Sequence, residues 1–159
     1  MFKISRRKSV NLSIAVALSF IAVVAVIAVL IPFAWENTPY FSKLVNDVVI
    51  NESQQLGRCV FFVWLYICFA IVEACCVMVF VLLIRVRKGL VFSEISVDCL
   101  RYISWLCMLL SLFLFVGEIF HPLMFVMAMA VVFLGLCLRV TKNVIELATS
   151  IKQEHDFTI

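Results

Sequence analysis

Four long stretches of this chain are poor in charged residues, and they constrain its fold more than any other feature. They cover about residues 10–34, 59–84, 97–118 and 123–140. About 20 consecutive apolar residues suffice for an α-helix to cross the hydrocarbon core of a bilayer. The pattern predicts an all-α polytopic membrane protein, with a single membrane domain over residues 1–159 that forms a bundle of four transmembrane helices.

The composition supports a bilayer as the solvent of this chain. Hydrophobic residues make up 65% and charged residues 14% of the 159 positions, whereas soluble domains carry about 25% charged residues. A chain of this length cannot bury so much apolar surface within itself. Basic residues flank the predicted spans and form no separate patch, so we expect no direct contact with nucleic acid.

Lys and Arg residues are distributed unevenly between the two ends of the predicted spans. Of the 13 Lys and Arg residues, only Lys43 and Arg58 fall in the loop predicted at residues 35–58. The others lie at the amino terminus, in or near a turn at residues 85–96, or toward the tail at residues 141–159. Because cytoplasmic flanks carry the excess of Lys and Arg, both termini are predicted to be cytoplasmic.

The turn at residues 85–96 has the residues that end one helix and begin another. Arg85, Arg87 and Lys88 suit a helix carboxyl end, and Gly89 suits a left-handed C-cap. Ser93 is an N-cap residue, followed by Glu94 in the first turn. One helix is therefore expected to end near Lys88 and the next to begin near Ser93, which predicts an antiparallel hairpin.

The first outer loop and the tail each show an amphipathic pattern. In the loop, Thr38 and Pro39 suit a helix start, and the apolar residues from Phe41 to Val49 share one face. This predicts a short amphipathic helix on the outer surface or over the mouth of the bundle. In the tail, Leu147 and Ile151 continue the apolar face of the fourth helix. That face is predicted to pack on residues 90–92; the alternative is a frayed tail.

An ionisable residue, Glu73, stands near the centre of the second predicted span. Such a residue is a functional hypothesis by default. Helical spacing on the third span aligns further polar residues with it, and Arg101 is expected to reach toward Glu73. The predicted intramembrane polar seam comprises Glu73, Arg101, Ser104, Ser111 and Glu118. It has two interpretations: a structural seam that fixes helix packing, or a site for a proton, a cation or a ligand.

The sequence contains no His-Glu-x-x-His motif and no Gly-x-Ser-x-Gly motif. We therefore expect no enzymatic activity, no cofactor and no metal site. His121 and His155 are the only histidines, and the predicted topology places them on opposite sides of the membrane. No Cys-x-x-Cys pair occurs, and metal sites need clustered ligands. The cysteines are interpreted as small apolar packing residues: Cys59, Cys68, Cys75, Cys76, Cys99, Cys107 and Cys137.

Two motifs resemble the hallmarks of one bacterial membrane-protein family. The central stretch Gly-Leu-Val-Phe-Ser, followed by polar residues and Leu-Arg, is similar to that family's Gly-x-x-Phe-Ser…Leu-Arg. The end of the chain, Glu-His-Asp-Phe-Thr-Ile, is similar to its Glu-x-Asp-Leu-Thr-Ile, with Phe157 in place of Leu. The family is domain-of-unknown-function family 2975. The matching residues are Gly89, Phe92, Ser93, Leu100, Arg101, Glu154, Asp156, Thr158 and Ile159.

The resemblance covers the four-span layout over nearly the whole chain, and it implies a bacterial cell (inner) membrane. Members of the family often look to be encoded beside a small helix-turn-helix regulator, which is therefore a candidate partner. No activity carries over from the resemblance. Both motifs fall on the predicted cytoplasmic side, which suggests a docking surface there comprising Gly89, Phe92, Ser93, Glu154, Asp156, Thr158 and Ile159.

Two functional hypotheses follow from these observations. In the first, the chain is a regulatory or sensory interaction protein that docks a cytoplasmic protein, with a homo-oligomer also compatible. In the second, it is a small transporter or toxin-immunity factor that works through Glu73. Substituting Glu73 by Gln separates them, because a transporter should fail and a docking protein should not.

The predicted orientation leads to a labelling experiment on sealed cells. A membrane-impermeant thiol reagent is expected to modify cysteine probes placed at Lys43 or Asn51, and not probes at Lys88 or Thr158, because positive charge marks the cytoplasmic side. External labelling at position 88 would overturn the topology.

Overall fold

The computed structural model of the chain describes the backbone of residues 6–37, 54–89 and 93–157. Within these ranges it describes the side chains of residues 10–34, 57, 59–89 and 93–151. The elements are α1 (Arg6–Asn37), α3 (Gln54–Arg87), α4 (Glu94–Val116), the short 3-10 helix η1 (Gly117–Ile119) and α5 (Leu123–Phe157), with no strand in these ranges.

Four of these helices are long and apolar enough to cross a membrane. The apolar segments run over Val10–Ala34, Cys59–Arg87, Glu94–Ile119 and Leu123–Ile151. The all-α architecture with four candidate spans is therefore confirmed. Helices suit this setting because hydrocarbon offers no partner for backbone N–H and C=O groups, and a helix satisfies them internally.

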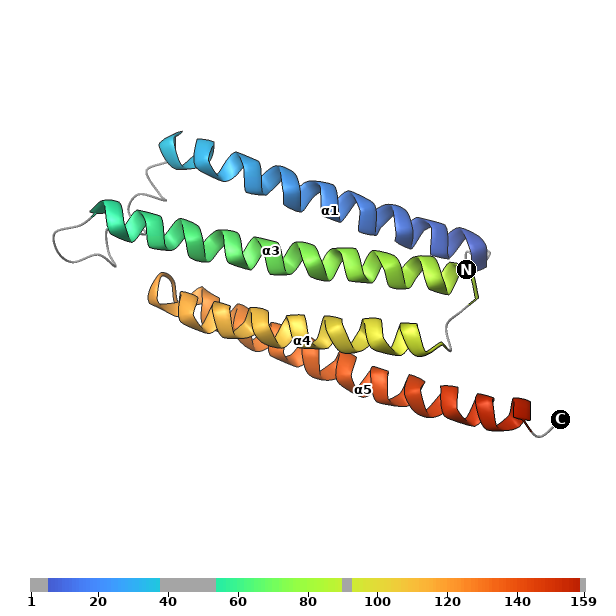
Figure 1. Cartoon of the computed structure of the whole chain (residues 1–159). Helices are drawn as coiled ribbons and strands as arrows, with labels where there is room; N and C mark the ends of the chain where they lie inside the picture. The colour runs from blue at the N-terminus through green and yellow to red at the C-terminus, as the bar shows by residue number, and fades with distance from the viewer. Residues whose placement is uncertain (1–5, 38–53, 90–92, 158–159) are drawn as a thin grey trace, which may run out of the picture.

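Each long helix packs chiefly against its neighbours along the chain. α1 lies on α3, α3 on α4, and α4 on α5 (Figure 1). The first turn of α1, the α3–α4 turn and the last turns of α5 lie at the same end of the structure. We call this the basic end, because Arg6, Arg7, Lys8, Arg85, Arg87 and Lys88 are found there. The other end is called the opposite end.

The helix ends at the basic end lie close to those expected from the sequence. α3 ends at Arg87 and α4 begins at Glu94, next to the expected ends near Lys88 and Ser93. The fourth helix continues far beyond residue 140, to Phe157, and extends past the start of α4 (Figure 1). The backbone of the tail is therefore helical through Phe157. The amphipathic helix predicted in the first outer loop falls on residues 38–53, outside the described residues.

The predicted caps of the α3–α4 turn are confirmed. Gly89 has a φ of 77°, in the left-handed region that favours glycine. The backbone N–H of Ser96 donates a hydrogen bond of 3.4 Å to the Ser93 side-chain oxygen, so Ser93 is the N-cap of α4. The two caps satisfy backbone groups at adjacent helix ends and fix the reversal of the chain.

The main apolar core lies toward the opposite end, where α3, α4 and α5 meet. It contains Phe61, Trp64 and Cys68 of α3, with Leu114 of α4 and Ala128 of α5. The Trp64 indole N–H donates a hydrogen bond of 2.8 Å to the Phe113 carbonyl. Gly117 lies against the indole ring, and a Cβ added at this position would overlap the Trp64 side chain. A glycine at the end of α4 therefore makes room for the largest side chain of the core.

The contact between α4 and α5 depends on small residues. The Ser104 hydroxyl donates a buried hydrogen bond of 3.0 Å to the Gly135 carbonyl. A Cβ at Gly135 would stand 3.3 Å from the Cys107 Cβ, which is tighter than ordinary contact. Two turns before Gly135, Ala128 is fully buried. Small residues of this kind let membrane helices approach closely.

We expect Gly117→Ala to destabilise the fold by about 1–3 kcal/mol, because the added methyl group overpacks a core whose Trp64 ring is fixed by a hydrogen bond. Thermal unfolding of the detergent-solubilised protein measures the effect as a lower midpoint. The matched control is Ala130→Val on the exposed face of α5, which should unfold like the parent. A Gly117→Ala variant as stable as the parent would contradict the packing described.

Candidate functional site

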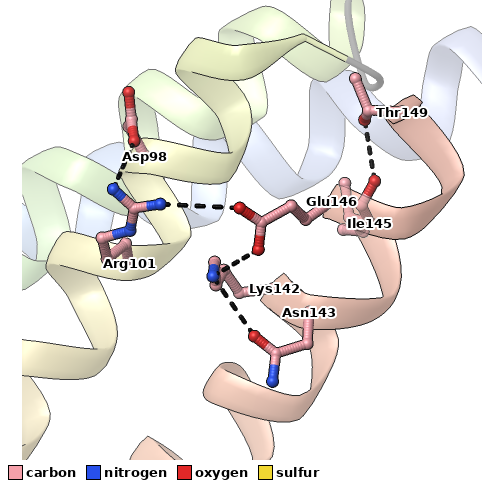
Figure 2. Close-up of polar contacts among 7 residues, drawn as sticks. All are labelled: Asp98, Arg101, Lys142, Asn143, Ile145, Glu146 and Thr149. Atoms are coloured by element: carbon pink, nitrogen blue, oxygen red, sulfur yellow. Dashed lines mark hydrogen bonds and ion pairs between the residues drawn. The ribbon is translucent and has the colours of Figure 1, made fainter. Parts of the chain in front are cut away.

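Four charged side chains of α4 and α5 meet near the basic end (Figure 2). The Arg101 guanidinium forms ion pairs of 3.3 Å with Asp98 and 3.7 Å with Glu146. Glu146 also pairs with the Lys142 ammonium group, four residues earlier on α5. We call Asp98, Arg101, Lys142 and Glu146 the ionic cluster. It joins α4 to α5, because the Glu146 carboxylate binds a cation from each helix.

The ionic cluster contributes little to the strength of the contact between α4 and α5. Side chains of Arg101 and Glu146 are 49% and 50% exposed, and exposed pairs of this kind contribute about 0–1 kcal/mol. The neighbouring side chains of Val97, Leu100 and Thr149, in contrast, are buried. The Thr149 hydroxyl donates its hydrogen bond to the Ile145 carbonyl of its own helix. Packing of these buried side chains therefore holds the part of α5 just beyond residue 140 against α4.

A second basic contact lies beside the ionic cluster. The Arg139 guanidinium carbon is 5.3 Å from the centre of the Trp105 ring, within the range of a cation–π interaction. Among the described residues, Arg139 forms no ion pair. The uncharged runs of α4 and α5 both end at this level. Toward the basic end, the last residue of the run is Tyr102 on α4 and Leu138 on α5.

The residues of the predicted polar seam lie in different environments. Ser104 and Ser111 are buried on one face of α4, and the Ser111 hydroxyl donates to the Met108 carbonyl within its own helix. Glu118 is exposed in η1. Arg101 pairs with Asp98 of its own helix and with Glu146 of α5 rather than reaching toward Glu73.

Glu73 lies on a different side of the structure from that seam. It is seven residues, or two helical turns, from Tyr66, whose hydroxyl donates 3.2 Å to the Ala28 carbonyl of α1. Glu73 is thus on the α1 side of α3. One of its carboxylate oxygens is buried without a hydrogen-bond partner among the described residues. The side chains of Cys75 on α3 and Cys107 on α4 lie near each other, which places Glu73 at the depth of about residue 109 of α4.

The predicted docking residues are described only in part. Gly89 and Ser93 cap the helices of the α3–α4 turn, whereas Phe92 lies outside the described residues. Glu154 and Asp156 belong to the last turns of α5, but the described side chains end at residue 151. Thr158 and Ile159 lie outside the described residues, as do the apolar residues 90–92 expected to cover the tail.

Sequence reasoning missed the ionic cluster. The four-residue spacing of Lys142 and Glu146 is a signal of a pair on one helix, and Asp98 and Arg101 show the same signal at three residues. What the sequence did not indicate is that α5 would continue alongside α4 and bring these two pairs together. That arrangement depends on the register of α4 and α5.

Histidine and cysteine side chains form no metal centre in the part of the chain whose side chains are described. There, no three His, Cys, Asp or Glu residues are grouped closely enough to hold an ion. The His121 ring nitrogen Nδ1 accepts a hydrogen bond of 3.1 Å from the Leu123 backbone N–H, which helps to start α5. All seven cysteines are free, and Cys68 and Cys99 are buried.

No protein-family model, no curated protein and no solved structure matches this chain. The resemblance to domain-of-unknown-function family 2975 therefore stays a prediction, based on the central motif and the carboxyl-terminal motif.

We expect Glu73→Gln to accumulate in membranes like the parent, and Glu73→Lys to accumulate less. Gln keeps the shape of a neutral carboxyl group, whereas a Lys at a helix centre costs roughly 2.5–3.5 kcal/mol on insertion. Immunoblots of the membrane fraction measure both. Asn143→Lys, on the exposed α5 extension, controls for an added lysine. Equal amounts of both Glu73 variants would mean that this position faces water or headgroups.

Proposed function

We propose that the protein is a small integral membrane protein that docks a soluble cytoplasmic protein on its fourth helix. The observation that carries this proposal is an apolar stripe on α5, made of Val140, Val144, Leu147 and Ile151. These side chains are 64%, 61%, 63% and 58% exposed. We call them the α5 stripe.

The position of the α5 stripe supports a protein partner. Helical spacing puts it opposite the α5 face that holds Thr149 and packs on α4. Most of the stripe lies beyond Lys142, where charged residues end the uncharged run of α5. From Lys142 to Phe157 the helix extends about 22 Å, at 1.5 Å per residue. Apolar residues at i, i+4, i+7 and i+11 share one face of a helix, and anchors on one face are what helix-in-groove recognition uses.

The charge distribution supports a cytoplasmic location for this helix. Because Lys and Arg gather at the basic end, we place that end in the cytoplasm, with both termini inside. The resemblance stated above extends the proposal to a bacterial inner membrane and to a small helix-turn-helix regulator as the partner. Docking a soluble regulator at the membrane requires no chemistry of the chain itself, and we propose a regulatory or sensory role without an enzymatic activity.

Site-specific photo-cross-linking in cells tests this proposal. A photoreactive residue at Leu147 or Ile151 should give a discrete adduct with a soluble protein, because these side chains are exposed beyond the charged residues Arg139 and Lys142. The matched control is Phe133, which is exposed on the same face of α5 but within the span; there, only lipid adducts are expected. Lipid adducts alone, or adducts only between copies of this chain, at positions 147 and 151 would contradict docking.

A second candidate function rests on Glu73. A carboxylate oxygen that is buried near the middle of a span without a hydrogen-bond partner is a suitable carrier for a proton or a cation. In that case the protein is a small transporter or a toxin-immunity factor. The same cells separate the two functions, because Glu73→Gln should leave the adducts at Leu147 and Ile151 unchanged if the protein docks a partner.

A further inference from the structure

A small hollow lies between α4 and α5, on the membrane side of the ionic cluster. Its walls are formed by Arg101, Ser104 and Trp105 of α4, with Arg139 and Lys142 of α5. The hollow has a volume of about 100 Å³, which is enough for several water molecules. It admits a small polar group with several oxygen atoms.

The charges around the hollow are not balanced. Arg101, Arg139 and Lys142 provide three positive charges, and the carboxylates that pair with them, Asp98 and Glu146, provide two negative charges. One positive charge is left over, and of these three cations Arg139 is the one that forms no ion pair with a described residue. The Lys142 side chain, which is only 15% exposed, is held in the wall. A group with a single negative charge would neutralise the site.

The depth of the hollow indicates where that group comes from. It lies where the uncharged run of each helix ends, which is the level of lipid headgroups. Trp105 is exposed, and aromatic side chains of this kind are enriched at the membrane interface. One and two turns farther from the basic end on the same face of α4, Leu109 and Leu112 are exposed, and Leu136 is exposed on α5. An acyl chain can follow these residues from the hollow into the membrane.

We propose that the hollow binds the phosphodiester group of an anionic phospholipid in the leaflet on the side of the basic end. The phosphodiester carries one negative charge, which matches the unbalanced charge. Arg139 and Arg101 provide planar donors that suit two phosphate oxygens at once, and Ser104 and Lys142 close the inner wall. Basic pockets between membrane helices are suited to anionic headgroups in this way.

Native mass spectrometry of the purified full-length protein with added phosphatidylglycerol tests this proposal. We expect retained phosphatidylglycerol adducts, and Arg139→Gln should weaken their affinity at least about tenfold, since a charge-assisted hydrogen bond is lost. Arg87→Gln, an exposed arginine of the basic end outside the hollow, should bind like the parent. An equal loss in both variants would indicate general surface charge and would overturn the proposal.

Further binding measurements distinguish an anionic lipid from a neutral lipid and from soluble phosphate. Phosphatidylethanolamine should bind more weakly than phosphatidylglycerol, because its amine cancels the charge of the phosphate; equal binding would overturn the choice of an anionic lipid. Inorganic phosphate alone should not displace phosphatidylglycerol, and full displacement would assign the hollow to a soluble anion instead. Trp105→Leu provides a second variant, expected to weaken phosphatidylglycerol binding while the protein keeps its helical circular dichroism. Unchanged binding in both Arg139→Gln and Trp105→Leu would exclude this site.

Discussion

The close approach of α4 and α5 at Ser104 and Gly135 determines most of what the basic end contains. A side chain at Gly135 would meet Cys107, so the two helices reach this distance only because position 135 lacks a Cβ. The buried Ser104–Gly135 hydrogen bond fixes their relative register. From that register it follows that Glu146 stands beside Arg101 and that Arg139 stands beside Trp105. The ionic cluster and the hollow are therefore consequences of one small-residue contact in the hydrophobic part of the protein.

Local features of the sequence predicted local features of the structure well. The four apolar runs, the left-handed Gly89 and the Ser93 cap each depend on a few neighbouring residues and on the chemistry of the backbone. The side chains that meet across helices were harder to predict. Arg101 was expected near Glu73 and instead pairs with Glu146, which is 45 residues away in the sequence. Helical spacing tells which residues share a face, but it does not tell which helix covers that face.

Glu73 and the α5 stripe represent opposite ways in which a membrane protein tolerates an unfavourable group. Glu73 puts an ionisable side chain on the α1 side of α3, with one carboxylate oxygen buried without a hydrogen-bond partner among the described residues. The α5 stripe exposes apolar side chains on the face of α5 that is turned away from α4. Both features cost free energy in the isolated chain. In the docking that we propose, a partner would remove the second cost by covering the stripe.

The order in which the helices pack has a consequence for how the protein is made. Because α1 contacts chiefly α3, α3 contacts α4, and α4 contacts α5, each hairpin closes with the helix synthesised just before it. Contacts between neighbours in the chain close short loops and form quickly. Each new span can thus pack as it leaves the ribosome, without waiting for a later one. The final step is the docking of α5, so both the ionic cluster and the main apolar core are completed only when synthesis of the chain is nearly finished.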